Sequence, residues 1–167
     1  VDFYTRVLGL RLIKRTVNFD DPSTYHLYYG DSVGTPGSVL TFFPWAGVRR
    51  GRPGTGQAYA TAFSVPAGSV PFWTARLLAH GVTPAAPVTR FGDEALAFTD
   101  PDGLVLELIA TSEPDTRTAH AHPEISAAHG IRGFHSVTLA VTSAAPTAAL
   151  LTGPMGYRAT LSSPGRI

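Results

Sequence analysis

The sequence of 167 residues contains no cysteine. The residues shown therefore form no disulfide, bind no metal through thiolates and offer no cysteine nucleophile. The sequence also lacks an unbroken apolar run of roughly 18 residues, which a membrane-spanning helix would need. No leader peptide is visible. Because the first residue is Val1 rather than methionine, the missing leader is only weak evidence about where the protein is located. We expect a cytoplasmic protein that does not interact with membranes.

An excess of charge of either sign is missing as well. Thirteen Lys and Arg residues balance twelve Asp and Glu residues, which leaves a formal net charge of +1. The basic loop 48-VRRGRPGTG-56 could attract an anion, but a nucleic-acid surface needs a larger basic face. The sequence has neither a glycine-rich phosphate-binding motif nor the turn that presents a serine nucleophile. Nucleotides and nucleic acids are therefore not predicted as partners.

Proline and glycine are plentiful, with 14 and 17 residues, and they separate short segments of regular pattern. The segment 58-AYATAFSVPAGS-69 is typical of a strand. The next segment, 70-VPFWTARLLAHG-81, predicts a helix that Ser69 can cap and Gly81 can end. The predicted apolar face of this helix consists of Phe72, Leu77 and Leu78. Three strands are predicted to follow, at 82–92, 94–100 and 104–110, which gives the order β-α-β-β-β.

The same order recurs on both sides of this module. Residues 1–9 predict a short helix, and the segments 10-LRLIKRTVNF-19, 23-STYHLYYG-30 and 37-GSVLTFFPW-45 predict three strands after it. A third copy starts with a strand at 131–141, followed by a helix and a strand within 142–161. Such internal repetition favours an α+β fold built of tandem β-α-β-β-β modules with curved mixed sheets. The alternative is a generic α+β domain without repeats.

This pattern divides the chain into three parts. Residues 1–111 are predicted to hold two modules, the first without its opening strand. Residues 112–130, which are rich in Pro, Ser, Thr and charge and include His120 and His122, are predicted to be a solvated linker. Residues 131–167 are predicted to begin a third, truncated module. Because such an assembly exposes sheet faces, we expect self-association, with a homo-oligomer as the outcome.

A single carboxylate, Glu107, interrupts the apolar strand 104-LVLELIA-110. A buried ionised carboxylate costs several kcal/mol unless it is paired or bound to a cation. Strand alternation places Glu107 on one face with Val105 and Ile109, and the three leucines of the segment on the other face. The charge of Glu107 therefore has to be stabilised by an arginine, by a metal ion or by water in a cleft beside it.

The repeated modules resemble those of the vicinal oxygen chelate superfamily, which includes glyoxalase I, bleomycin-resistance proteins and extradiol ring-cleaving dioxygenases. Four stretches resemble one branch more closely, the hydroquinone-type ring-cleaving dioxygenases: VDFYTRVLGLRLIKRTVNFDDPSTYHLYYGD, GTPGSVLTFFPWAG, RFGDEALAFTDPDGLVLELIA and IRGFHSVTLAV. The most specific motif is NFDDPSTYHLYYGD followed by LTFFPW. The resemblance covers nearly the whole chain. It implies a glyoxalase-like fold and an Fe(II) enzyme that cleaves a hydroquinone ring beside a hydroxyl, with a small aromatic substrate and O2.

In that branch, two His and one Glu hold the iron, and this ligand set leaves positions open for substrate and oxygen. The resemblance places the first His on the opening strand of the first module and the other two ligands in a fourth module. All three are therefore expected outside residues 1–167.

Two metal-ligating residues remain within the chain as a possible second site. His135 lies on the opening strand of the third module, where Tyr59 is its counterpart in the second, and Glu107 lies on a closing strand. These three residues could converge if the second and third modules pair. The alternative is that Glu107 pairs with an arginine or lines a wet cleft and that His135 is an ordinary hydrogen-bonded strand residue.

Several aromatic residues are candidates for substrate binding. His26 lies in 24-TYHLYYG-30, and Phe42, Phe43 and Trp45 follow in the next predicted strand. Tyr59 is a further candidate. A structural role in a strand or in the core is the alternative for each. In the loop 18-NFDDPS-23, Asp20 or Asp21 is predicted to cap the turn.

The sequence thus predicts part of an Fe(II)-dependent ring-cleaving dioxygenase for hydroquinone-like aromatics, without the expected iron ligands. A non-catalytic protein that sequesters small molecules in the same cleft is a second possibility. A glyoxalase-like metal-dependent isomerase is a third, but it would need a metal carboxylate from each paired module. Thr41, at the position that matches Glu107, argues against the isomerase.

Overall fold

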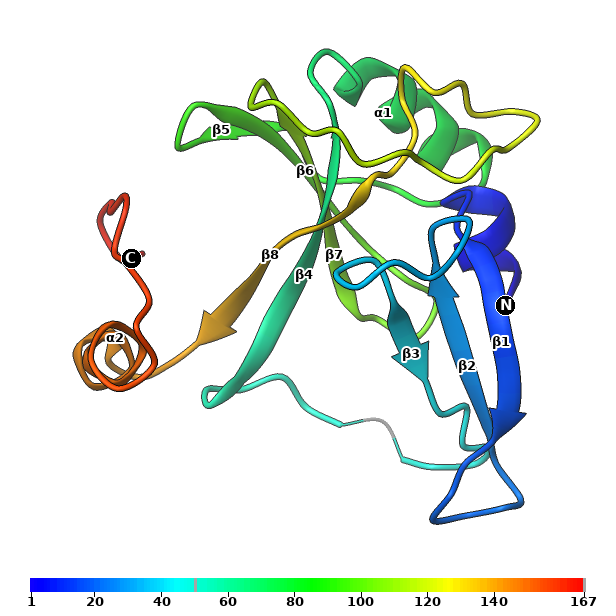
Figure 1. Cartoon of the computed structure of the whole chain (residues 1–167), viewed down its shortest axis with the longest axis horizontal. Helices are drawn as coiled ribbons and strands as arrows, with labels where there is room; N and C mark the ends of the chain where they lie inside the picture. Colours follow the sequence, from blue (N-terminus) through cyan, green and yellow to red (C-terminus); the bar gives the residue numbers. More distant parts are fainter. Residues whose placement is uncertain (50, 167) are drawn as a thin grey trace.

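The computed structural model describes residues 1–49 and 51–166 and arranges them around two β-sheets (Figure 1). Near the N-terminus, the short π-helix η1 (Phe3–Val7) precedes a three-stranded antiparallel sheet. Its strands follow the order β1-β2-β3, with bounds Arg11–Val17, Tyr25–Gly30 and Leu40–Phe42. Arg50, part of the basic loop, lies outside the described residues.

The second sheet has five strands in the order β5-β6-β7-β4-β8. Their bounds are Gln57–Pro66 for β4, Val88–Arg90 for β5, Asp93–Thr99 for β6, Val105–Thr111 for β7 and Gly133–Ala140 for β8. Strand β4 pairs in parallel with β7 and antiparallel with β8. The helix α1 (Val70–Ala79) connects β4 to β5. The opening strands of the predicted second and third modules are therefore neighbours in one sheet.

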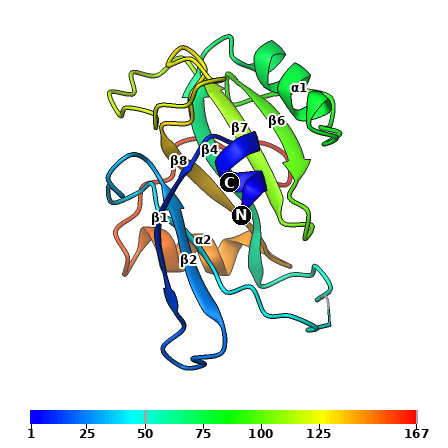
Figure 2. The same ribbon diagram turned by 90° about the vertical axis from the view of Figure 1, so that its right-hand side faces the viewer.

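Both sheets contribute to one hydrophobic core, together with η1 and α1. Phe3, Tyr4 and Val7 of η1 belong to it, and Figure 2 shows η1 in front of the five-stranded sheet. In β7 the predicted alternation is confirmed, because Leu106 and Leu108 lie in this core. Ile109 packs instead with Ala62 and Ala95 on the opposite face. Each fully buried large side chain contributes roughly 1.5–3 kcal/mol to folding.

Two buried polar contacts join the first module to the second. The Tyr4 hydroxyl donates a hydrogen bond of 2.7 Å to Asp100, in the turn between β6 and β7. Burial and this bond raise the pKa of Tyr4 well above its usual range. The buried Arg76 of α1 donates to the backbone oxygens of Arg6 and Val7, at 2.5 and 2.8 Å. These oxygens lie at the end of η1, so α1 holds this helix in place.

Residues 112–130 are packed against α1 for part of their length rather than free in solvent. Trp73 donates to the backbone oxygen of His129 at 2.9 Å, and Ser69 Oγ donates to the oxygen of Ala128 at 3.2 Å. Phe72 stacks on the His129 ring at 4.4 Å. Most of this segment is exposed, but positions 69, 72, 73 and 76 share one helix face and bind part of it, so the predicted linker is not free in solvent along its whole length.

Other expectations need correction. The Ser69 side chain makes no capping bond, because it bonds the segment after β7 instead. Leu78 is 54% exposed, and Trp73 and Arg76 are buried in its place. The predicted strand 82–92 has only three residues in strand conformation, Val88–Arg90. No helix among the described residues is long and apolar enough to cross a membrane.

The C-terminal part forms the predicted helix but not the predicted strand. Helix α2 (Ala144–Thr152) has no buried residue, and it lies apart from the two sheets in Figure 1. After it, the described residues contain one isolated bridge, between Ser163 and Arg166. A strand needs a neighbouring strand to pair with, and none of the described segments provides one there.

Candidate functional site

The predicted site residues lie mainly on the two sheet faces that are turned away from the shared core. On the three-stranded sheet, His26 and Tyr28 alternate with Leu27 and Tyr29, which are in the core. Thr41 lies directly opposite Tyr28 in the β2–β3 ladder and therefore shares its face. This face carries a group of rings.

Four neighbouring rings, tilted or stacked against one another, form what we call the aromatic row: Tyr28, His26, Phe43 and Trp45. The His26 ring lies 4.1 Å from Tyr28 and 4.1 Å from Phe43 between ring centroids. Phe43 stacks on Trp45 at 5.4 Å with an interplanar angle of 28°. At the other end, Lys14 Nζ lies 5.5 Å from the centroid of the Tyr28 ring. The row thus starts beneath an ammonium group and ends at an indole.

The His26 imidazole is anchored at one nitrogen only. Its Nδ1 lies 2.8 Å from the Tyr28 hydroxyl. Its Nε2 is buried and has no hydrogen-bond partner among the described residues. An unpartnered buried nitrogen costs about 1–3 kcal/mol, so the stacking contacts have to offset that cost. The structure thus brings His26 together with Phe43 and Trp45 of the candidate set.

The loop before β2 supports the end of the aromatic row. Asp21 accepts hydrogen bonds from Ser23 Oγ at 2.6 Å and Thr24 Oγ1 at 2.7 Å, so Asp21 caps this turn, as one of the two predicted alternatives. Hydrogen bonds from Ser23 and then Thr24 lower the pKa of Asp21, and Trp45 also lowers it through its side chain. The motif that contains Asp21 therefore lies beside Trp45.

Phe42 and Tyr59 lie elsewhere. Phe42 points to the opposite face of its strand and packs against the core, with its ring 4.7 Å from Tyr4. Tyr59 falls at an irregularity in the β4–β8 pairing, in the other sheet, and its side chain is exposed. Neither residue is part of the aromatic row.

Glu107 has an arginine partner, which the sequence did not specify. Arg90 donates two hydrogen bonds to its carboxylate, Nη2 to Oε1 at 2.7 Å and Nη1 to Oε2 at 3.0 Å. Glu107 is 7% exposed. Arg90 reaches it from the hairpin between β5 and β6, whose two turn residues Phe91 and Gly92 both have positive φ. The sequence signal for this turn was the Phe-Gly pair between two short strands.

His135 lies on β8 beside other charged groups. Its Nδ1 is 2.9 Å from the hydroxyl of Ser136. Burial lowers the pKa of His135, and the charge of Asp93 opposes this shift. Together with Asp93, Asp115 and Arg117, His135 lines a cavity of about 340 Å³. Asp115 and Arg117 form a salt bridge of 2.7 Å within the lining of this cavity.

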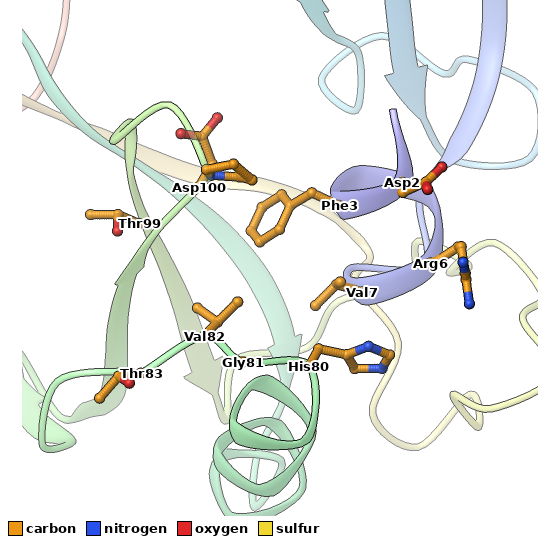
Figure 3. Close-up of a pocket in the computed structure, with 11 residues that line it drawn as sticks. Asp2, Phe3, Arg6, Val7, His80, Gly81, Val82, Thr83, Thr99 and Asp100 are labelled. Atoms are coloured by element: carbon orange, nitrogen blue, oxygen red, sulfur yellow. The ribbon is translucent and has the colours of Figure 1, made fainter.

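The larger cavity, of about 660 Å³, lies between η1, the end of α1 and the turn after β6 (Figure 3). Phe3 and Val7 reach into it from η1, and Val82 faces them. None of the predicted site residues lines this cavity. It is a groove at the junction of the first two modules, on the core side of the sheets.

A metal site within the described part of the chain lacks support from geometry. No group of three or more His, Asp or Glu side chains among those residues is arranged to hold a metal ion. Both carboxylate oxygens of Glu107 are hydrogen-bonded to Arg90. These residues therefore do not fit an iron ion as they stand.

Comparisons with known proteins agree with the fold. The family model described as "Glyoxalase/Bleomycin resistance protein/Dioxygenase superfamily" matches residues 1–108. The protein named "Putative ring-cleaving dioxygenase MhqO" of Bacillus subtilis (strain 168) is 46% identical over 155 residues, which cover 93% of this chain and 49% of that protein. The "Chlorohydroquinone/hydroquinone 1,2-dioxygenase" of Sphingobium indicum is 35% identical over 144 residues, covering 83% of this chain and 44% of that protein.

Among solved structures, one titled as a putative dioxygenase from Bacillus subtilis superposes with a TM-score of 0.88 at 44% identity. The match covers 97% of this chain and 52% of that chain. A glyoxalase family protein from Enterococcus faecalis shares the fold, with a TM-score of 0.52 at 23% identity over 65% of this chain and 83% of its own. The chain spans about half the length of the curated relatives it matches.

Proposed function

This chain belongs to the Glyoxalase/Bleomycin resistance protein/Dioxygenase superfamily, and we propose that the complete protein is a ring-cleaving dioxygenase of hydroquinone-like aromatics. The observation that carries the proposal is the similarity, over most of the chain, to several proteins named as ring-cleaving dioxygenases. A fourth relative is named for hydroquinone and chlorohydroquinone. The aromatic row supports the same substrate class, because stacked rings suit a planar aromatic ligand.

The proposal includes Fe(II), O2 as second substrate, and cleavage of the ring beside a hydroxyl. The iron ligands are proposed to come from outside the residues described, because those residues contain no suitable cluster and Glu107 is bonded to Arg90. We assign Glu107 to this ion pair, and we leave His135 as a polar residue of the cavity on the same sheet.

A second candidate function is metal-free sequestration of a small aromatic molecule. One observation favours it: both carboxylate oxygens of Glu107, on a closing strand, are hydrogen-bonded to Arg90 and are therefore not free to bind a metal ion. The isomerase is less well supported, because it needs a free carboxylate in each paired module. Thr41 has no carboxylate, and that of Glu107 is bonded to Arg90.

Oxygen uptake distinguishes the two candidates. The complete protein is loaded with Fe(II) under anaerobic conditions and then mixed with hydroquinone and air-saturated buffer. A dioxygenase consumes one O2 per hydroquinone, and both atoms of ¹⁸O2 appear in the ring-opened product by mass spectrometry. Binding of hydroquinone without uptake, in protein that contains iron, would contradict the dioxygenase and support sequestration.

A further inference from the structure

We propose that the indole of Trp45, at the open end of the aromatic row, is a stacking platform for the ring of one small phenolic molecule. This inference rests on the proposed function, because it says where the ring of the proposed substrate class would lie. It concerns binding only and needs neither iron nor O2.

The first observation is that the row is closed at one end and open at the other. Lys14 covers the Tyr28 end, and each inner ring has a neighbour on both sides. Trp45 is covered on one side by Phe43 and is 48% exposed. A planar ring on its free side would extend the stacked pair of Phe43 and Trp45 at the end of the row. Stacking of this kind tolerates different ring substituents, because every aromatic ring has a π-face.

The second observation is that the indole is held in position before any ligand arrives. The backbone N–H of Trp45 donates to the oxygen of Phe43 at 3.0 Å, so the chain folds back sharply at Pro44. Proline fixes the φ angle that such a tight turn needs. The Phe43 ring, stacked on the indole at 5.4 Å, further limits its movement. A ring that is already ordered loses little conformational entropy when it binds a ligand.

The third observation concerns size. A single half-exposed indole is far smaller than the roughly 1,000 Å² that a specific protein interface buries. A small molecule therefore fits this site better than a second protein surface does.

NMR of the indole N–H groups tests the proposal. The complete protein, labelled with ¹⁵N, is kept free of metal with a chelator and titrated with hydroquinone under argon. The Trp45 signal is identified by its loss in Trp45→Phe. We expect this signal to shift with ligand and to saturate, whereas the signal of Trp73, which is fully buried, stays in place.

Matched ligands and variants separate stacking from other contacts. Cyclohexane-1,4-diol carries the two hydroxyls without a π-face and should leave the Trp45 signal unchanged. Trp45→Leu should weaken hydroquinone binding about tenfold, as expected for loss of one ring–ring stack. Trp45→Phe should keep most of the affinity. Tyr25→Leu removes another half-exposed ring, on the opposite face of β2, and should have no effect.

Two results would overturn the inference. One is hydroquinone binding of unchanged affinity in Trp45→Leu. The other is a Trp45 signal that depends on protein concentration but not on hydroquinone, which would mean that a second copy covers the indole. Oxygen uptake plays no part in these readouts. A protein that binds at Trp45 but consumes no O2 would therefore disprove the dioxygenase and leave the platform intact.

Discussion

At the scale of single residues, the ion pair with Arg90 explains how the apolar strand β7 accommodates the carboxylate of Glu107. Both oxygens of Glu107 accept a hydrogen bond from one guanidinium group, in a partly buried setting. Removing one member of such a pair leaves the other charge desolvated and costs more than the pair itself contributes. Arg90→Met is therefore expected to lower the free energy of unfolding by about 2–4 kcal/mol, measured by urea denaturation at pH 7.

The double variant Arg90→Met with Glu107→Leu provides the control for this prediction. It replaces both charges by apolar groups, so its stability should return to within about 1 kcal/mol of the parent protein. Iron content of the complete protein is a second readout. Loss of iron in Glu107→Gln, with the fold intact, would show that Glu107 is a metal ligand and that its pairing with Arg90 is not its main role.

At the scale of elements, α1 links the first module to the second and holds the segment after β7. Arg76 donates to the end of η1 and to Glu124 at 3.0 Å, from a position that is almost fully buried. Arg76→Met keeps the aliphatic packing but leaves the carbonyl oxygens of Arg6 and Val7 without their donor. We expect the free energy of unfolding to fall by about 2–3 kcal/mol and amide exchange in η1 to become faster. Hydrogen-exchange mass spectrometry measures the second effect.

Glu124→Gln is the informative comparison for Arg76. Glu124 is exposed, and water screens ion pairs at the surface, so this variant should change stability little. If Glu124→Gln destabilised the protein as much as Arg76→Met, the ion pair rather than the two backbone contacts would hold the segment.

The elements also show which features the sequence could predict. Alternation and turn residues predicted the module order and the burial of Leu106 and Leu108, because strand period and glycine turns act locally. Ser69 was mispredicted because its hydroxyl bonds the backbone oxygen of Ala128, 59 residues away in the sequence. Leu78 was mispredicted because α1 turns Trp73 and Leu77 toward the core and leaves Leu78 exposed. The candidate site shows the same limit. Strand alternation places His26 and Tyr28 on one face of β2, but the pairing of Arg90 with Glu107 depends on a tertiary contact.

At the scale of the whole molecule, open strand edges and exposed apolar residues predict that the protein self-associates. Within the described residues, β8 pairs with β4 on one side only, and β3 with β2 on one side only. An open strand edge offers free backbone groups to another chain. Val137 and Leu139 of β8 are exposed, and so are Leu150 and Met155 in and after α2. This concentration of apolar surface next to a free edge is typical of a protein interface.

We therefore expect the protein to self-associate through the region of β8 and α2, with a mass by light scattering that rises with concentration. Val137→Lys with Leu139→Lys places two like charges on β8 and should shift the equilibrium toward the monomer. Lysines at Tyr25 and Val33, which are exposed on the other sheet and its loop, are the matched control and should leave the mass unchanged. If the complete protein is instead monomeric and the β8 lysines destabilise it, then its own chain covers β8, since buried lysines would be desolvated in the folded monomer.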